Sequence, residues 1–310
     1  MEPSFLLLSA LTNWKGGDVR LAPDVAIRRL KDAERCAADA GDVEGYWLCH
    51  EFDNPYEDEL ARHKKRRETA FKLMTYATYA IQVSMPCGAT GVFLLFRRNG
   101  EGWSQCGVER RQQILPTEWA VRCVVPPQFA CDAPAMLERV LEAFYKPVLR
   151  LQIPLWMMEQ GLAAPDRHIR ILLCSTGLSS LTKASGQAVF KERLCSLLGA
   201  GTLIFPPDGA GRQPGYRVEE VAGQLYQLRN ELAHGLPFGA IFHRKTGFLD
   251  CDGRPVTEEF ARCRYDKVLE ECAVFLMCRA MREVLLSRLV FDVRRMEWAA
   301  AGGGDESTFT

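Results

Sequence analysis

The chain has 310 residues, a hydrophobic content of 47%, a charged content of 25% and a formal net charge of zero. These values are typical of a globular protein of one large or two ordinary domains. They exclude a uniformly basic surface, so any contact with nucleic acid has to be local. No basic segment precedes the first apolar run, and no apolar stretch is long enough to cross a bilayer. We therefore expect a cytoplasmic protein that has no signal peptide and does not contact a membrane.

The twelve cysteines follow no recognisable pattern. No Cys-x-x-Cys pair occurs, and none of the five histidines stands beside a pair of cysteines at ligand spacing. A chain of this length builds an ample core without a disulfide framework. We expect reduced and mostly buried thiols, with no metal site and no cofactor.

Residues 1–133 alternate between short strand patterns and helix patterns, which predicts a small α+β domain. The predicted strands cover residues 5–8, 25–30, 46–52, 91–96 and 119–125, and the predicted helices cover 31–40 and 56–83. We assign this domain no separate activity.

A basic run lies on the second predicted helix and contains Arg62, Lys64, Lys65, Arg66 and Arg67. Clustered basic side chains on a helix can follow a phosphate backbone and guide RNA to a site. The alternative is an ordinary solvated helix face whose charge is balanced by neighbouring acids. Both interpretations stay open at the level of the sequence.

The triplet Cys49-His50-Glu51 superficially resembles a nucleophile beside a base. It falls on a predicted strand, where adjacent side chains point to opposite faces of the sheet. Cys49 and His50 therefore do not meet, and we expect no catalysis at this triplet.

From residue 134 onward the pattern is helical, after a proline-rich linker at residues 126–134. Helices are predicted over residues 136–158 with breaks at the prolines, 166–180, 188–198, 217–234 and 257–294. We expect an all-α domain over residues 134–298 and a disordered tail over 299–310. The last helix carries more apolar residues than one bundle core needs, which suits either a dimer face or burial against the N-terminal domain.

One segment of this helical half combines residue types that suit a specific chemistry. Apolar residues recur every three or four positions from Val218 to Leu232, so one face of this helix is buried. Gly235 and Pro237 end the helix, which places His234 in its last turn and Arg229 five residues earlier. The partial negative charge of a helix C-terminus favours the imidazolium form of a histidine, and an arginine offers a planar fork to a phosphate. Together they suit the attack of a ribose 2′-hydroxyl on the adjacent phosphate, which needs proton transfer and charge stabilisation.

The sequence Arg229-Asn230-x-x-x-His234 resembles the R-x(4–6)-H signature of the HEPN superfamily, the higher eukaryotes and prokaryotes nucleotide-binding domains. The polar residue after the arginine also matches. Residues 169–180 and 188–199 resemble the two helices that precede the motif in the ApeA-like HEPN group, and the similarity covers about residues 137–294. Proteins of that group often carry a β-containing region before the helical domain.

The resemblance implies a metal-independent endoribonuclease of a defence or toxin system, which acts as a homodimer with the two motifs at the interface. Arg229 then binds the scissile phosphate, His234 moves the proton and Asn230 orients the backbone or the RNA. Tyr226 and Glu231 are expected to support this geometry, with His243 and Arg244 as secondary candidates. The expected partners are RNA, a second copy of the chain and a regulatory or antitoxin protein. The alternative is a non-catalytic module for dimerisation or for binding nucleotides or RNA.

Overall fold

The computed structural model divides the chain into two compact units. The described residues are 4–12, 14–39, 45–55, 59–84, 87–89, 91–110, 127–145, 151–205, 216–234 and 258–300. The first unit comprises Met1–Ala120 and Val125–Leu141, and the second comprises Val121–Val124 and Glu142–Thr310. The predicted α+β fold class is confirmed, because an antiparallel sheet dominates the first unit and helices dominate the second. The boundary predicted at residues 133 and 134 falls at the start of α4 (Ala133–Tyr145).

The sheet of the first unit has the strand order β2-β3-β4-β1-β6-β7. These strands are β1 (Ser4–Thr12), β2 (Val19–Ala22), β3 (Val25–Arg28), β4 (Tyr46–Asp53), β6 (Val92–Asn99) and β7 (Gly102–Arg110), and β5 (Gly88–Ala89) pairs with the end of β1. The central strand β1 pairs with β4 through Leu7 and His50 and with β6 through Leu7 and Leu95. Residues 5–9 of β1 are all buried, as a strand covered on both faces requires.

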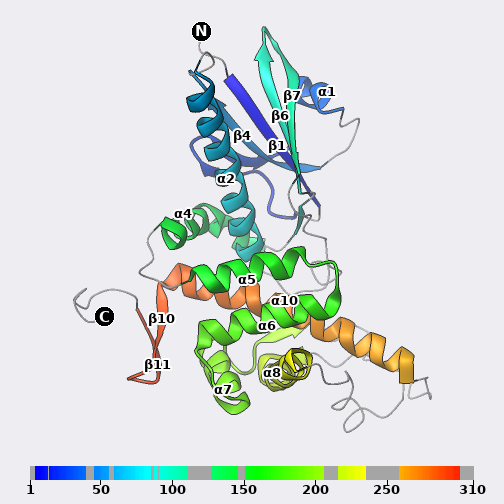
Figure 1. Ribbon diagram of the computed structural model, residues 1–310, viewed down its shortest axis with the longest axis vertical. Coiled ribbons are helices and arrows are strands. Elements are labelled where there is room, and N and C mark those ends of the chain that lie inside the picture. The colour runs from blue at the N-terminus through cyan, green and yellow to red at the C-terminus, as the bar shows by residue number, and fades with distance from the viewer. Residues whose placement is uncertain are drawn as a thin grey trace. The chain divides into compact units, whose positions relative to one another are not determined.

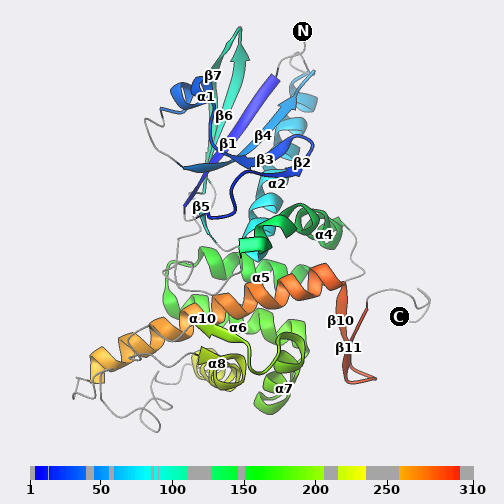
Figure 2. The same ribbon diagram turned by 180° about the vertical axis from the view of Figure 1, so that it is seen from behind.

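Two helices cover opposite faces of this sheet (Figures 1 and 2). The short α1 (Asp32–Ala37) covers a cluster of buried side chains contributed by three strands and the loop before α1. This cluster consists of Leu6, Leu8, Leu30, Cys49 and Phe96. The long α2 (Leu60–Ser84) covers the other face, where its Phe71 ring lies edge-on to Phe93 with 6.2 Å between the ring centroids. The described helices include none that is both long and apolar enough to cross a membrane.

The second unit is a helical bundle followed by a small hairpin. Its helices are α5 (Gln152–Ala163), α6 (Arg167–Thr182), α7 (Gln187–Leu198), α8 (Val218–Ala233) and α10 (Glu258–Ser287), with the strand pair β8 (Leu203–Phe205) and β9 (Tyr216–Arg217) before α8. The helix α6 packs against α5, α8 and α10, and α10 runs along the bundle (Figure 2). A Cβ atom on Gly161 of α5 would lie 2.7 Å from Cys174 Sγ, so glycine permits the close approach of α5 and α6.

A buried ion cluster joins α6 to α10. Glu270 of α10 accepts hydrogen bonds from Arg170 and, at 3.0 Å, from Arg167 Nε. The side chains of Arg170 and Glu270 are 6% and 11% exposed, so removing one partner would leave a charge that water hardly reaches. The pairing therefore fixes how the two helices lie against each other along their length.

The hairpin of β10 (Leu289–Asp292) and β11 (Glu297–Ala300) packs against α7, close to the connection between α6 and α7. The Arg193 guanidinium lies 4.0 Å from the centroid of the Phe291 ring and donates hydrogen bonds to the carbonyl oxygens of Thr182 and Lys183. In return, Trp298 Nε1 donates to the carbonyl oxygen of Arg193 over 3.1 Å.

The structure corrects two helix predictions. The interruption expected near Pro147 falls between α4, which ends at Tyr145, and α5, which begins at Gln152, while Pro147 itself lies outside the described residues. The break expected at Pro154 is wrong, because Pro154 lies in the first turn of α5, where its missing N–H costs little. The last helix ends at Ser287 and not at residue 294, because Arg288 adopts a left-handed φ of 49° and the chain enters β10. The expected tail begins within β11, and residues 301–310 lie outside the described residues.

Candidate functional site

The motif helix α8 is fixed at its start by local hydrogen bonds. The Glu220 carboxylate accepts from the backbone N–H of Arg217 at 2.8 Å, and Glu219 adds a second acid to the first turn, where acids suit the helix dipole. The apolar face predicted from the sequence is largely buried. Its fully or almost fully buried members are Val218, Val221, Ala222, Leu225 and Leu228. This packing determines which way the polar residues of the motif point.

Arg229 is held by two contacts that come from different helices. Its Nη1 donates a hydrogen bond to Ser179 Oγ of α6 at 2.7 Å, and its Cζ lies 4.8 Å from the centroid of the Tyr226 ring, one turn earlier on α8. The Tyr226 ring packs in turn against Phe190 of α7, with 5.3 Å between the centroids. We call Ser179, Phe190, Tyr226 and Arg229 the Arg229 cluster.

The guanidinium of Arg229 has no carboxylate partner in the described part of the chain. The residue is half-buried, and the hydrogen bond to Ser179 uses only part of its donor capacity. A half-buried cation with a fixed position and unused donors is a suitable binding group for a phosphate oxygen. The predicted phosphate contact of Arg229 is compatible with this environment.

His234 is the residue at which α8 ends. Its backbone N–H donates to the carbonyl oxygen of Asn230 at 3.0 Å, and its φ and ψ of −94° and 4° depart from regular helix geometry. The side chain of His234 is exposed and that of Asn230 is half-buried. The imidazole of His234 is therefore accessible to a bound substrate, as a group that transfers protons has to be.

Arg229 and His234 leave α8 in different directions. Five residues of α-helix correspond to a net rotation of about 140° and a rise of about 7.5 Å. No hydrogen bond or ring contact joins the two side chains in the structure as described. The geometry of one α8 helix therefore does not direct both Arg229 and His234 towards the same phosphate.

Of the two expected supporting residues on α8, only Tyr226 contacts Arg229. Glu231 follows Arg229 by two positions, which places it about 200° around the helix. It is 7% exposed and forms no hydrogen bond within the described ranges, and burial raises the pKa of its carboxyl group. His234 lies three positions further on, so any support from Glu231 concerns His234 and the end of the helix. His243 and Arg244 lie outside the described residues.

The basic run occupies the first two turns of α2 in the first unit. Arg62, Lys64, Lys65 and Arg66 are exposed, whereas Arg67 is half-buried and reaches towards Gly107 of β7. Arg62 forms an ion pair with Glu59, with 3.1 Å between Nε and the nearer carboxylate oxygen. The run and the motif helix belong to different units, and their contact with one RNA stays a prediction.

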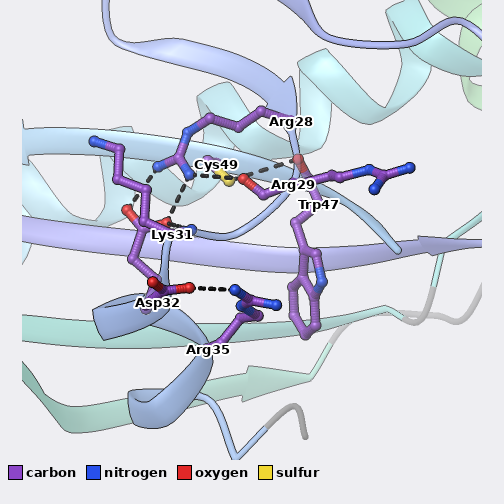
Figure 3. Close-up of polar contacts among 8 residues, drawn as sticks. Arg28, Arg29, Lys31, Asp32, Arg35, Trp47 and Cys49 are labelled. Carbon is purple, nitrogen blue, oxygen red and sulfur yellow. Dashed lines mark hydrogen bonds and ion pairs between the residues drawn. The ribbon is translucent and has the colours of Figure 1, made fainter. Parts of the chain in front are cut away.

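Of the Cys49-His50-Glu51 triplet on β4, Cys49 and His50 are buried and Glu51 is exposed. Cys49 pairs opposite Leu8 and His50 opposite Leu7, so the two side chains occupy opposite faces of β4. Burial raises the pKa of the Cys49 thiol to about 12, and His50 Nε2 lies 3.0 Å from an oxygen of Asp24. Figure 3 shows the Cys49 sulfur directed at the carbonyl oxygen of Trp47, 3.5 Å away, beneath the side chain of Arg28. A thiol that stays protonated at neutral pH is no nucleophile.

Ser179 is the site residue that sequence reasoning missed. It lies on the buried side of α6, four positions after Ser175 and three before Thr182. The signal that the sequence offers is a serine on an otherwise apolar helix face, because most buried polar side chains have a hydrogen-bond partner. Fifty residues separate Ser179 from Arg229, so the sequence did not identify that partner.

Within the ranges that the structure describes, no group of three or more His, Cys, Asp and Glu side chains is arranged to hold a metal ion. No protein-family model, curated protein or solved structure matches this chain. The case for a function accordingly rests on the residues and geometry of α8 and its neighbours.

Proposed function

We propose that the protein is a HEPN-type endoribonuclease that cleaves RNA without a metal ion, at a composite site formed by two copies of the chain. The observation that carries the proposal is the state of Arg229, whose guanidinium is held by Ser179 and Tyr226 and has no carboxylate partner among the described residues. The exposed His234 at the end of the same helix supplies an imidazole, the side chain that most often transfers protons in enzymes.

The proposed reaction uses the substrate's own nucleophile. The ribose 2′-oxygen attacks the adjacent phosphorus while His234 of one copy accepts its proton, and the bond to the 5′-oxygen of the next nucleotide breaks as that oxygen takes a proton from the imidazolium of His234 in the second copy. Arg229 stabilises the charge that develops on the phosphate oxygens. The products are a 2′,3′-cyclic phosphate and a 5′-hydroxyl end, and Asn230 orients the RNA or the backbone.

The composite site follows from the position of His234. One imidazole does not easily act as base and as acid on opposite sides of a phosphate in the same step. The divergence of Arg229 and His234 around α8 adds a second reason, because a second copy of the helix would offer the missing group from another direction. The regulatory or antitoxin protein, like the role in defence, stays a prediction from the resemblance.

The proposal is tested by incubating labelled total RNA with the purified protein in EDTA. We expect cleavage by the wild type and a loss of about 100-fold or more in rate for His234→Ala, the usual size of a general acid–base contribution. Arg229→Ala is expected to lose activity as well. Both variants should keep the melting temperature of the wild type, since His234 is exposed and Arg229 only half-buried. Full activity in both folded variants contradicts the assignment.

A non-catalytic module that binds RNA or nucleotides is the second candidate. The specific observation in its favour is that no contact joins Arg229 to His234 within the described residues. This candidate predicts RNA binding without cleavage, weakened by Arg229→Ala and unaffected by His234→Ala.

A further inference from the structure

The hydrogen bond between Arg229 and Ser179 has a directional consequence. A guanidinium can offer a phosphate two parallel donors along one of its edges. Nη1 of Arg229 donates one of its two N–H groups to Ser179 Oγ at 2.7 Å, and the edge formed by Nε and Nη2 stays complete whichever of the two is used. The edge that Arg229 offers therefore depends on a residue of α6 as well as on the motif helix.

The other members of the Arg229 cluster restrict the guanidinium further. The Tyr226 ring lies 4.8 Å from Arg229 Cζ and limits movement of the guanidinium on that side. Tyr226 is 7% exposed, and its ring is packed against Phe190, which is fully buried. Three helices thus fix one cation before any ligand arrives.

We propose that Ser179 is a positioning residue for phosphate binding, which directs the Nε–Nη2 edge of Arg229 towards a phosphate group of single-stranded RNA. This inference rests on the proposed function, since it assumes that Arg229 contacts RNA. Ser179 itself is 9% exposed and acts through Arg229. Without its hydroxyl group, the guanidinium would rotate about its last side-chain bonds and present either edge.

The test measures the affinity of the full-length protein for a fluorescein-labelled, single-stranded 2′-O-methyl RNA by fluorescence anisotropy. This RNA lacks the free 2′-hydroxyl and is not cleaved, so binding is separated from reaction. We expect Ser179→Ala to weaken binding by about fivefold, the usual value of one hydrogen bond, and Ser179→Thr to restore most of the affinity. The slope of log affinity against log salt should stay unchanged in Ser179→Ala, because that substitution removes no charge. In Arg229→Ala the magnitude of this slope should fall by about 0.7, the value for one phosphate contact on a single strand.

The matched control is Ser175→Ala, one turn earlier on the same helix. Ser175 is fully buried, and its Oγ has no hydrogen-bond partner in the described structure, so the same substitution there should leave RNA affinity unchanged. A double-mutant cycle adds a readout that a merely structural role would not give. Ser179→Ala should have no further effect once Arg229 has been replaced by alanine.

The outcomes separate this inference from the proposed function. If Arg229→Ala weakens binding while Ser179→Ala does not, the role of Ser179 is wrong and the role of Arg229 stands. If Ser179→Ala weakens binding equally in the Arg229→Ala background, Ser179 acts through the fold and not through Arg229. If the wild type binds no RNA, or binds it equally well without Arg229, the proposed function and the inference fail together.

Discussion

At the scale of single residues, the arginines of this protein differ in what they are bonded to. Arg170 and Arg28 each pair with a buried glutamate, and Arg193 is bonded to backbone carbonyl groups. These contacts use the charge or the donors within the fold. Arg229 is held by a neutral hydroxyl group and an aromatic ring, so its charge is not neutralised by another side chain of the described chain.

The Arg28–Glu34 pair offers a stability test at the residue scale. Burial tends to raise the pKa of Glu34, but the hydrogen bonds from Arg28 and from the Lys31 backbone outweigh it, and the pKa is lowered. A carboxyl with a lowered folded-state pKa stabilises the fold above its unfolded pKa, which is about 4.3, and loses this contribution as the pH falls through the folded value. Glu34→Gln should therefore lower the free energy of unfolding by about 2 kcal/mol at pH 7, because it leaves the Arg28 charge without its partner.

The measurement is urea unfolding at several pH values, with Asp32→Asn as the control. Asp32 lies on the same short helix and pairs with Arg35, but its side chain is 90% exposed, so its replacement should change little. The difference between wild type and Glu34→Gln should shrink as the pH falls below about 4. An equal effect of both substitutions, or a difference that does not depend on pH, would show that the buried ion pair has no such role.

At the scale of elements, the sequence predicts helices better than it predicts edge strands. The start of α6 is signalled by Asp166, whose carboxylate accepts from the N–H of Ile169 at 3.0 Å, and the apolar spacing of α8 marks its buried face. The strand β7 was missed because its side chains are mostly exposed, so the sequence shows no apolar run there. Its extended conformation is stabilised by the pairing with β6, which a local pattern does not reveal. The hairpin after α10 was missed for a similar reason, since the left-handed Arg288 ends a pattern that otherwise continues as a helix.

The same limit applies to the site. Local sequence was sufficient to place Arg229, Asn230 and His234 at the end of one helix, because α8 is specified by residues within a few positions of each other. It was not sufficient to find the hydrogen bond of Arg229 to Ser179 or the packing of Tyr226 against Phe190. Those relations depend on the packing of α6 and α7 against α8.

The basic first two turns of α2 lead to a prediction at the element scale. If this surface binds RNA, replacing the exposed Lys64 and Lys65 by alanine should reduce the slope of log affinity against log salt by about 0.7 for each phosphate group that a lysine no longer neutralises. Lys72→Ala is the matched control, because Lys72 is an exposed lysine two turns further along the same helix. An unchanged slope in the Lys64/Lys65 variant would favour the alternative of an ordinary solvated face.

At the scale of the whole molecule, the balanced charge of the chain restricts how RNA can be bound. The formal net charge is zero, so long-range attraction to RNA is weak and specific contacts have to supply the affinity. The candidate RNA-binding residues are distributed over both units, with the basic run in the first and Arg229 in the second.

The composite site makes a quantitative prediction for mixed assemblies. Wild-type and His234→Ala chains are co-expressed with different tags in equal amounts, and the RNA cleavage rate per total protein is measured. If cleavage needs both histidines of a dimer, only wild-type pairs are active, and the rate should be about one quarter of the wild-type rate. If one histidine is enough for each reaction, the rate should be about one half, which would contradict a site that uses the histidines of both copies.

The fastening of the β10–β11 hairpin determines where the chain can be shortened. Arg193 contacts Phe291, and Trp298 donates a hydrogen bond to the backbone of Arg193. A chain cut after Ser287 would keep every described helix of the second unit, yet Arg193 would lose its contact with the Phe291 ring and the hydrogen bond from Trp298. Because Ser179 and Phe190 lie on α6 and α7, fragments and fusions intended to keep the Arg229 cluster intact should retain the chain through Ala300.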